Sequence, residues 1–205
     1  MLLSNLFRIL NSYKFSIFKI IFFEILYIVK GYKGNKFNLT KNETMSDNIP
    51  CPYYFLMKIK KVLKQNGFKT FLDLGSGSGR TIDFFNKNFS NCEFIGVEYL
   101  INQCNESKKI FANNKNIKII QSDFTKINLT DLKPDCLYLN NPFRNYNQTE
   151  DFLKKIIKSF SNEKNILFIF VNYNKNIFKS FKNIKHIDSY YISDIKGYSI
   201  FGLYE

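Results

Sequence analysis

Glycine and acidic residues are combined in the middle of the chain in a pattern that suits the binding of a small polar molecule. The segment 73–79, Asp-Leu-Gly-Ser-Gly-Ser-Gly, places Gly75, Gly77 and Gly79 directly after a short apolar run, with Ser76 between the first two. Alternating glycines allow a tight turn and let a ligand approach the backbone closely. The carboxylate of Asp73 would repel a dinucleotide's pyrophosphate but attract a positively charged ligand. The loop therefore indicates a cationic ligand without phosphate.

Two more acidic residues follow the next two apolar runs. Glu98 lies 19 residues past Gly79 and is followed by Tyr99, which is where an acid that binds ribose hydroxyls is expected in a nucleotide-binding sheet. Asp123 comes after the third run, and we expect it to accept a hydrogen bond from an adenine amino group while Phe124 contacts the ring. The alternative roles are a surface acid for Glu98 and a helix N-cap for Asp123.

A fourth candidate segment, Asn140-Asn141-Pro142-Phe143, ends the fourth apolar run. Its alternative role is an ordinary turn, because Asn and Pro are common turn residues. At the end of a strand, however, these side chains would lie at the edge of the sheet where ligands bind. We therefore treat these four residues as candidates for the catalytic site.

The elements that position these residues alternate between strands and helices. Such alternation predicts a doubly wound α/β fold, a mostly parallel sheet covered on both faces, with ligands at the carboxyl ends of its strands. The predicted strands are Phe71–Leu74, Phe94–Val97, Ile117–Ile120, Cys136–Leu139 and Ile166–Val171. The predicted helices are Tyr53–Gln65, Arg80–Phe89, Ile101–Asn113 and Glu150–Ser161.

Both ends of the chain depart from this alternation. Two strand-like runs, Ile187–Ile192 and Tyr198–Tyr204, predict an antiparallel pair at the C-terminus. Residues 31–48 are polar and rich in Gly, Asn and Lys, which is typical of a linker. We therefore expect an N-terminal helical extension and linker over residues 1–45 and a single catalytic domain over residues 46–205.

The ordered motifs over about residues 71–143 resemble those of the class I methyltransferases that use S-adenosylmethionine (SAM). The resemblance implies that Gly75, Gly77 and Gly79 hold the methionine part of SAM, that Glu98 binds the ribose and that Asp123 reaches the adenine. Amine-methylating members often have Asn-Pro-Pro followed by Tyr or Phe, whereas this chain has Asn140-Asn141-Pro142-Phe143. An Asn-Asn pair before an aromatic residue is also similar to histone-lysine methyltransferases.

Three functions follow as hypotheses. We favour a methyltransferase that acts on a protein or small molecule, with a nitrogen acceptor, because no general base for a hydroxyl acceptor is evident. The alternatives are an adenine-type nucleic-acid methyltransferase, which lacks the extra domain that base-flipping enzymes usually need, and a peripheral membrane protein with a degenerate scaffold. Intact Asp73, Glu98 and Asp123 disfavour the last hypothesis.

The N-terminal thirty residues are apolar and basic. Apolar residues at helical spacing predict a helix that packs either on the domain, which we favour, or on an anionic membrane surface; they are Leu2, Leu6, Ile9, Tyr13, Ile17 and Ile20. Charges at Lys19 and Glu24 disfavour a spanning helix, and the single alanine, Ala112, disfavours a signal peptide.

Composition excludes several classes of protein. With 45% hydrophobic residues the chain is too apolar to be disordered. The net charge is +13, and 27 of the 30 cations are lysine. This lysine bias is typical of an AT-rich coding sequence, so the positive charge is weak evidence for a nucleic-acid partner. The four cysteines form no CxxC pair and there is one histidine, so no metal site is expected. Unpaired thiols are typical of the cytoplasm.

Overall fold

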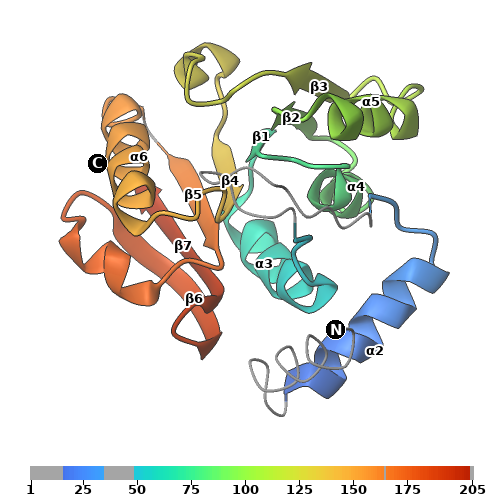
Figure 1. Ribbon diagram of the computed structural model, residues 1–205, viewed down its shortest axis with the longest axis horizontal. Helices are drawn as coiled ribbons and strands as arrows, with labels where there is room; N and C mark the ends of the chain where they lie inside the picture. Colours follow the sequence, from blue (N-terminus) through green and yellow to red (C-terminus); the bar gives the residue numbers. More distant parts are fainter. Residues whose placement is uncertain (1–15, 35–48, 164, 204–205) are drawn as a thin grey trace.

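A seven-stranded sheet forms the centre of the computed structural model, which describes residues 16–34, 49–163 and 165–203 (Figure 1). The strand order is β3-β2-β1-β4-β5-β7-β6, with β1 to β5 parallel and β7 antiparallel to both of its neighbours. The predicted doubly wound fold with an antiparallel C-terminal pair is confirmed. The strands are β1 (Thr70–Leu74), β2 (Glu93–Glu98), β3 (Ile117–Gln121), β4 (Cys136–Asn140), β5 (Ile166–Val171), β6 (Lys185–Ser193) and β7 (Lys196–Leu203).

Three helices connect parallel strands, as predicted: α4 (Arg80–Asn86), α5 (Ile101–Ile110) and α6 (Tyr146–Ser159). The helices α2 (Ser16–Val29) and α3 (Tyr53–Asn66) precede β1, and the short 3-10 helices η1 (Leu129–Leu132) and η2 (Lys175–Ser180) precede β4 and β6. The helix α6 begins four residues before the predicted start at Glu150. The reason is an N-cap that the sequence analysis missed: the side chain of Asn145 accepts hydrogen bonds from the backbone N–H groups of Asn147 and Gln148.

The central strands are buried on both faces, so they divide the apolar side chains between two cores. In β4, Cys136 and Tyr138 point into the core shared with α3 and α4, whereas Leu137 and Leu139 point into the core shared with α6. This alternation is why the strands are recognisable in the sequence as continuous apolar runs. All four cysteines are buried and unpaired.

The C-terminal hairpin is longer than predicted. Its strands β6 and β7 extend toward each other until a two-residue turn, Asp194 and Ile195, separates them. A side chain at Gly197 would collide with the backbone of Tyr190 and Tyr191 on the paired strand, so the pairing here needs glycine. The predicted end at Tyr204 lies outside the described residues.

The N-terminal helix α2 lies beside α3 at the edge of the molecule (Figure 1). The side chains of Ile20 and Tyr27 pack into the core shared with α3, as expected for Ile20, and Ile17 is buried too. The predicted apolar positions from Leu2 to Tyr13 lie outside the described residues. No helix in the described part of the chain is long and apolar enough to cross a bilayer. The domain division at residue 45 stays a prediction.

Candidate active site

The glycine loop joins the carboxyl end of β1 to α4. Gly75, Gly77 and Gly79 have φ angles of 78°, 56° and 93°, in the left-handed region that only glycine enters without strain. A side chain at Gly79 would also overlap the ring of Phe111 on the next helical segment, at 2.5 Å from its Cε2 atom. The loop therefore turns sharply enough to leave its backbone close to the strand ends.

Two buried carboxylates flank this loop. Asp73, on β1, is 2% exposed, and Glu98, at the end of β2, is 6% exposed. Burial, followed by the negative charge of Glu98, holds the pKa of Asp73 well above its usual range. Burial also raises the pKa of Glu98, although hydrogen bonds from Leu100, Gly77 and Tyr99 work in the opposite direction. The pair would be stabilised by a positively charged ligand, which relieves the repulsion between the two groups.

Glu98 is held in place by backbone donors. The N–H of Gly77 donates to Oε2 at 2.8 Å, and the N–H of Leu100 donates to Oε1 at 2.7 Å. A carboxylate has about four lone-pair sites, and the N–H groups of Gly77, Leu100 and Tyr99 all bond to Glu98, so it keeps acceptor capacity for about one ligand hydroxyl group. These bonds tie the glycine loop to the end of β2.

A small cavity of about 20 Å³ lies between β1, the glycine loop and the start of α3. Asp73, Gly75, Ser76 and Ser78 line it, and the hydroxyl groups of both serines are buried without a hydrogen-bond partner. Unpartnered buried hydroxyl groups are costly and point to a missing polar ligand. The volume is about that of one water molecule, so the cavity would take only one end of a bound molecule.

The third acidic candidate lies at the end of β3. Asp123 Oδ1 accepts hydrogen bonds from the backbone N–H and the hydroxyl of Thr125, at 3.0 and 2.6 Å. Burial alone would raise the pKa of Asp123, but these bonds and the charge of Lys126 lower it. Asp123 therefore caps a turn, and no helix begins here, because the next helical segment, η1, starts at Leu129. One oxygen, Oδ2, faces Lys126 at 3.5 Å, and the adenine-binding role stays a prediction.

The two aromatic candidates for cofactor contact differ in exposure. Phe124 is buried, and its ring is the nearest group to the place where a Gly75 side chain would lie, at 3.9 Å. Tyr99 is 45% exposed directly after β2. Phe124 thus lies beside the glycine loop, and Tyr99 is open to solvent.

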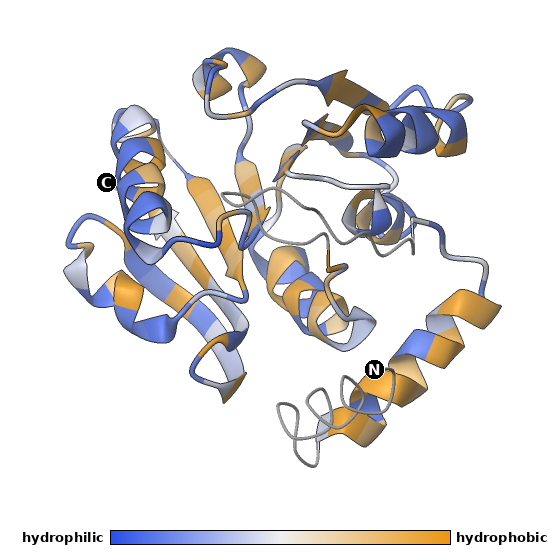
Figure 2. Cartoon of the chain, viewed as in Figure 1, coloured by the Kyte–Doolittle hydropathy of each residue, from blue (hydrophilic) through white to orange (hydrophobic). Residues whose placement is uncertain are grey.

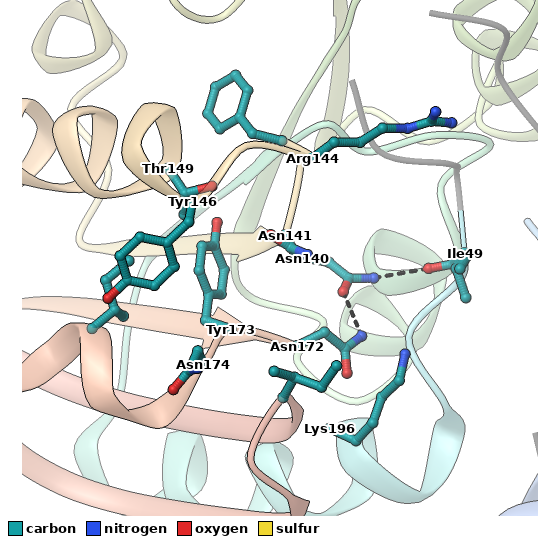
Figure 3. Close-up of a pocket in the computed structure, with 13 residues that line it drawn as sticks. Ile49, Asn140, Asn141, Arg144, Tyr146, Thr149, Asn172, Tyr173, Asn174 and Lys196 are labelled. Carbon is teal, nitrogen blue, oxygen red and sulfur yellow. Dashed lines mark hydrogen bonds between the residues drawn. The ribbon is translucent and has the colours of Figure 1, made fainter. Parts of the chain in front are cut away.

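Asn140 ends β4 and is held by two hydrogen bonds (Figure 3). Its Nδ2 donates to the carbonyl oxygen of Ile49 at 2.9 Å, and its Oδ1 accepts from Nδ2 of Asn172 at 2.8 Å. Asn172 follows the adjacent strand β5, so the two amides meet because their strands are paired. Asn141 and Asn172 have φ angles of 34° and 59°, which let the chain leave each strand end abruptly.

A larger cavity of about 390 Å³ opens beside this amide pair. Its described lining comprises amides, hydroxyl groups, aromatic rings and two cations, Arg144 and Lys196, with Tyr146 and Tyr173 on the side opposite Ile49 (Figure 3). Burial lowers the pKa of Lys196. Of the described residues, Asn140 alone lines both this cavity and the cavity at the glycine loop. It therefore marks the junction between the two.

The other members of the fourth motif have different environments. Phe143 is 5% exposed and packs edge-on against Phe124 and Phe152. Asn141 and Phe143 line the larger cavity, whereas Pro142 is half-buried and lines neither. The structure thus brings Asn140, Asn141 and Phe143 together at one cavity, and it separates Asp123 and Tyr99 from it.

Comparison with known proteins agrees with this geometry. Residues 71–162 match a family model described as a methyltransferase domain, which covers the glycine loop, both carboxylates and the Asn140 motif. The match identifies residues 71–162 as a methyltransferase domain, which supports a class I SAM-dependent methyltransferase. No curated protein sequence matches this methyltransferase.

Solved structures share the fold of this methyltransferase at low sequence identity. The delta-N METTL16 MTase domain has a TM-score of 0.63 and 15% identity, covering 90% of this chain and 94% of that one. A putative caffeoyl-CoA O-methyltransferase from Staphylococcus aureus has a TM-score of 0.58 and 14% identity, and the match covers 98% of each chain. An RNA methyltransferase from Salinibacter ruber, solved with S-adenosylhomocysteine, has a TM-score of 0.56 and 12% identity, and the match covers 77% of this chain and 95% of that one. These proteins differ in acceptor, so the likeness shows the fold alone.

The residues present fit SAM. Its ammonium and sulfonium groups are cations, which suits the buried pair of Asp73 and Glu98, and the unpartnered hydroxyl groups of Ser76 and Ser78 offer further polar contacts. We assign Asp73 and the glycine loop to the amino-acid end of SAM and Glu98 to a ribose hydroxyl group, as predictions from this charge and donor pattern.

Several site residues were missed by the sequence analysis of this methyltransferase. Asn172 follows the predicted strand Ile166–Val171, so the strand-end argument that selected Asn140 would also have found it. Tyr146, Tyr173 and Lys196 carry no comparable signal, because they reach the cavity through helix α6, a loop and the C-terminal hairpin.

Arg80 supports the glycine loop from outside. Its Nη1 donates to Glu24 Oε2 of α2 at 2.8 Å and to the carbonyl oxygen of Cys51 at 3.2 Å, and its guanidinium lies 4.4 Å from the Tyr53 ring centroid. Glu24 Oε1 also accepts from the N–H of Tyr53 at 2.8 Å. The N-terminal helix is therefore bonded to the first turn of both α3 and α4.

Proposed function

We propose that this methyltransferase transfers the methyl group of SAM to a nitrogen atom of a protein or small-molecule acceptor bound in the cavity of about 390 Å³. The observation that carries the proposal is the position of Asn140, which borders both the cofactor-side and the larger cavity. A group at that junction is placed to contact the acceptor where it meets the cofactor.

Asn140 has the chemistry for an amine acceptor. Its Oδ1 accepts one hydrogen bond from Asn172 and has a lone pair left for an amine hydrogen. Its Nδ2 is bound to the Ile49 carbonyl, which fixes the orientation of the amide. When bound, SAM supplies a methyl group on a sulfonium centre, which is a good leaving group. Alignment of the acceptor nitrogen therefore supplies much of the catalysis.

The described lining offers few bases to a hydroxyl acceptor. A hydroxyl group needs a base to remove its proton as it reacts. The described residues around the larger cavity include no carboxylate or imidazole, and Lys196, whose pKa is lowered by burial, is the candidate base among them. A neutral amine attacks with its own lone pair, and the extra proton of the methylated ammonium is released to solvent after the transfer.

A nucleic-acid base is the second candidate acceptor, because Asn140-Asn141-Pro142-Phe143 approaches the Asn-Pro-Pro-aromatic motif and the chain is basic. Phe143 is buried against Phe124 and Phe152, so its ring is packed within the protein. Tyr146, which is 48% exposed on the cavity wall, is the ring open to a planar base. If this candidate is correct, methyl groups from SAM are transferred to nucleic acid and not to protein or small molecules.

Substitution of Asn140 tests the proposal. Tritiated SAM is incubated with fractionated lysate, and label is followed in protein, nucleic acid and small molecules. We expect Asn140→Ala to lower kcat by about 100-fold or more, on the order of 3 kcal/mol of alignment, with SAM affinity nearly unchanged. Asn183→Ala, an exposed amide that does not line the cavity, is the control. Near-wild-type turnover by Asn140→Ala, or base-labile ester label, would contradict the nitrogen mechanism, and label confined to nucleic acid would favour the second candidate.

A further inference from the structure

The outer face of α2 is a continuous apolar surface. Six large aliphatic and aromatic side chains on this helix are exposed, from 46% at Ile21 to 80% at Val29. They are Phe18, Ile21, Phe22, Ile25, Ile28 and Val29. Figure 2 shows this helix as predominantly hydrophobic at the edge of the molecule. Soluble proteins seldom expose so many large apolar side chains together unless the surface binds something.

This surface is distinct from the face of α2 that packs on the domain. Exposed positions 18, 21, 22, 25, 28 and 29 recur at three- and four-residue spacing, which places them along one side of a helix. Ile20 and Tyr27 are buried in the core shared with α3 on the other side, where Glu24 binds Arg80. Because packing on α3 uses only the inner face, the outer face needs a second explanation.

Positive charge lies along one side of the apolar face. Lys19 and Lys30 are 11 residues apart, which places them on the same side of the helix near its two ends, and Lys33 follows; all three are exposed. In the described residues before Phe71 there are eight lysines and one acidic residue, Glu24, whose carboxylate is bound by Arg80. A wide apolar face edged by lysines is the pattern of helices that lie in the interface of anionic membranes.

We propose that the outer face of α2 binds the surface of an anionic lipid bilayer, with Phe18, Phe22 and Ile25 inserted at the boundary between headgroups and acyl chains. Lys19 and Lys30 then lie at the level of the lipid phosphates. The helix has 14 residues, about 21 Å at 1.5 Å per residue, so it would lie in the plane of the interface.

Charge favours a bilayer over a second copy of the chain. A symmetric dimer through α2 would bring Lys19 and Lys30 of both copies to one interface edge, where like charges repel. Anionic headgroups instead complement these lysines. The membrane is therefore the occupant whose chemistry matches both the apolar and the charged part of the face.

Vesicle sedimentation with the full chain tests this proposal. The vesicles contain either phosphatidylcholine alone or phosphatidylcholine with about 30% phosphatidylglycerol. We expect wild type to bind the anionic vesicles and to dissociate as salt rises, since screening weakens attraction between lysines and headgroups. The triple variant Phe18→Ala/Phe22→Ala/Ile25→Ala should lower the partition coefficient by about tenfold or more, while alanine preserves helix propensity.

Matched variants separate the alternatives. Ile101→Ala removes a comparably exposed apolar side chain from α5 and should leave vesicle binding within about twofold of wild type. Lys19→Gln/Lys30→Gln should reduce the preference for anionic vesicles. The proposal is overturned if wild type stays in the supernatant with both vesicles, or if the folded triple variant binds as wild type does. A dimer that the triple variant dissociates, without vesicle binding, would assign the face to a second copy.

Discussion

Asn140 and Asn172 are joined by a 2.8 Å hydrogen bond between their side chains, across the ends of adjacent parallel strands. The bond runs from Nδ2 of Asn172 to Oδ1 of Asn140, the atom that we propose meets the acceptor. Asn172 is thus a positioning residue, since it contacts the acceptor-binding group and orients it.

Substitution of Asn172 should weaken catalysis through Asn140. We expect Asn172→Ala to lower kcat by about tenfold, less than Asn140→Ala, because the Ile49 carbonyl still holds one side of the amide. The double variant should be no slower than Asn140→Ala, since residues that act as one unit are not additive. Steady-state kinetics of the three variants measure this. Losses that multiply in the double variant would show that Asn172 acts independently.

Glu98 should contribute directly to cofactor affinity. Glu98→Gln keeps the size of the side chain, and Glu98→Ala removes both acceptor oxygens. We expect the alanine variant to bind SAM and S-adenosylhomocysteine more weakly by about 1.5–3 kcal/mol, the scale of lost charge-assisted hydrogen bonds. Isothermal titration calorimetry measures both ligands. Glu93→Ala, an exposed acid at the start of the same strand, is the control, and wild type that gives no heat with either ligand would contradict the assignment.

The buried carboxyl of Asp73 should make stability depend on pH. Its pKa in the folded protein is raised well above 3.8, mainly by burial, so from pH 3.8 up to that raised value the folded state binds more protons than the unfolded state. Stability contributed by this group is therefore lost as pH rises through that window. Asp73→Asn removes the effect, and its Tm should exceed that of wild type more at pH 8 than at pH 5.

Thermal unfolding at the two pH values checks this, with Asp151→Asn on the exposed side of α6 as the control. The same Asp73→Asn variant should bind SAM more weakly, because it loses the negative charge that faces the cationic ligand. An equal Tm difference at pH 5 and pH 8 would show that Asp73 is not the titrating group.

The ion pair between Glu24 and Arg80 should be worth more than an exposed one. Glu24→Gln leaves the largely buried guanidinium of Arg80 without its carboxylate, and we expect a loss of about 1–3 kcal/mol in unfolding free energy. Glu150→Gln breaks the more exposed pair with Lys154 on α6 and should cost about 0.5 kcal/mol or less. Chemical denaturation compares them. Equal losses would show that burial adds nothing to the Glu24 pair.

Much of the fold and part of the site could be predicted from the sequence because the central strands are buried on both faces. Continuous apolar runs such as Cys136–Leu139 then identify strands, and the polar residues that end them identify the edge where ligands bind. Helix boundaries were less accurate at Asn145, whose capping depends on a loop conformation that periodicity does not report.

The acceptor side was less predictable than the cofactor side. The glycine loop and Glu98 belong to one compact stretch of sequence. Asn172, which follows β5, and Lys196, which begins β7, reach the larger cavity from much later in the chain. Their meeting with Asn140 depends on the strand order β4-β5-β7, and that order is a property of the whole sheet. The outer face of α2 was hidden for a different reason: helical spacing shows apolar positions but does not show which of two apolar faces is covered.

The acid pair Asp73 and Glu98 lies inside a protein whose net charge is +13. SAM is itself a net cation, so at long range the molecule repels its own cofactor, and only close to the strand ends does the local field become attractive. Salt screens the distant charges more than the buried ones. Added salt should therefore speed the encounter with SAM, the reverse of ordinary electrostatic steering, in which salt slows association.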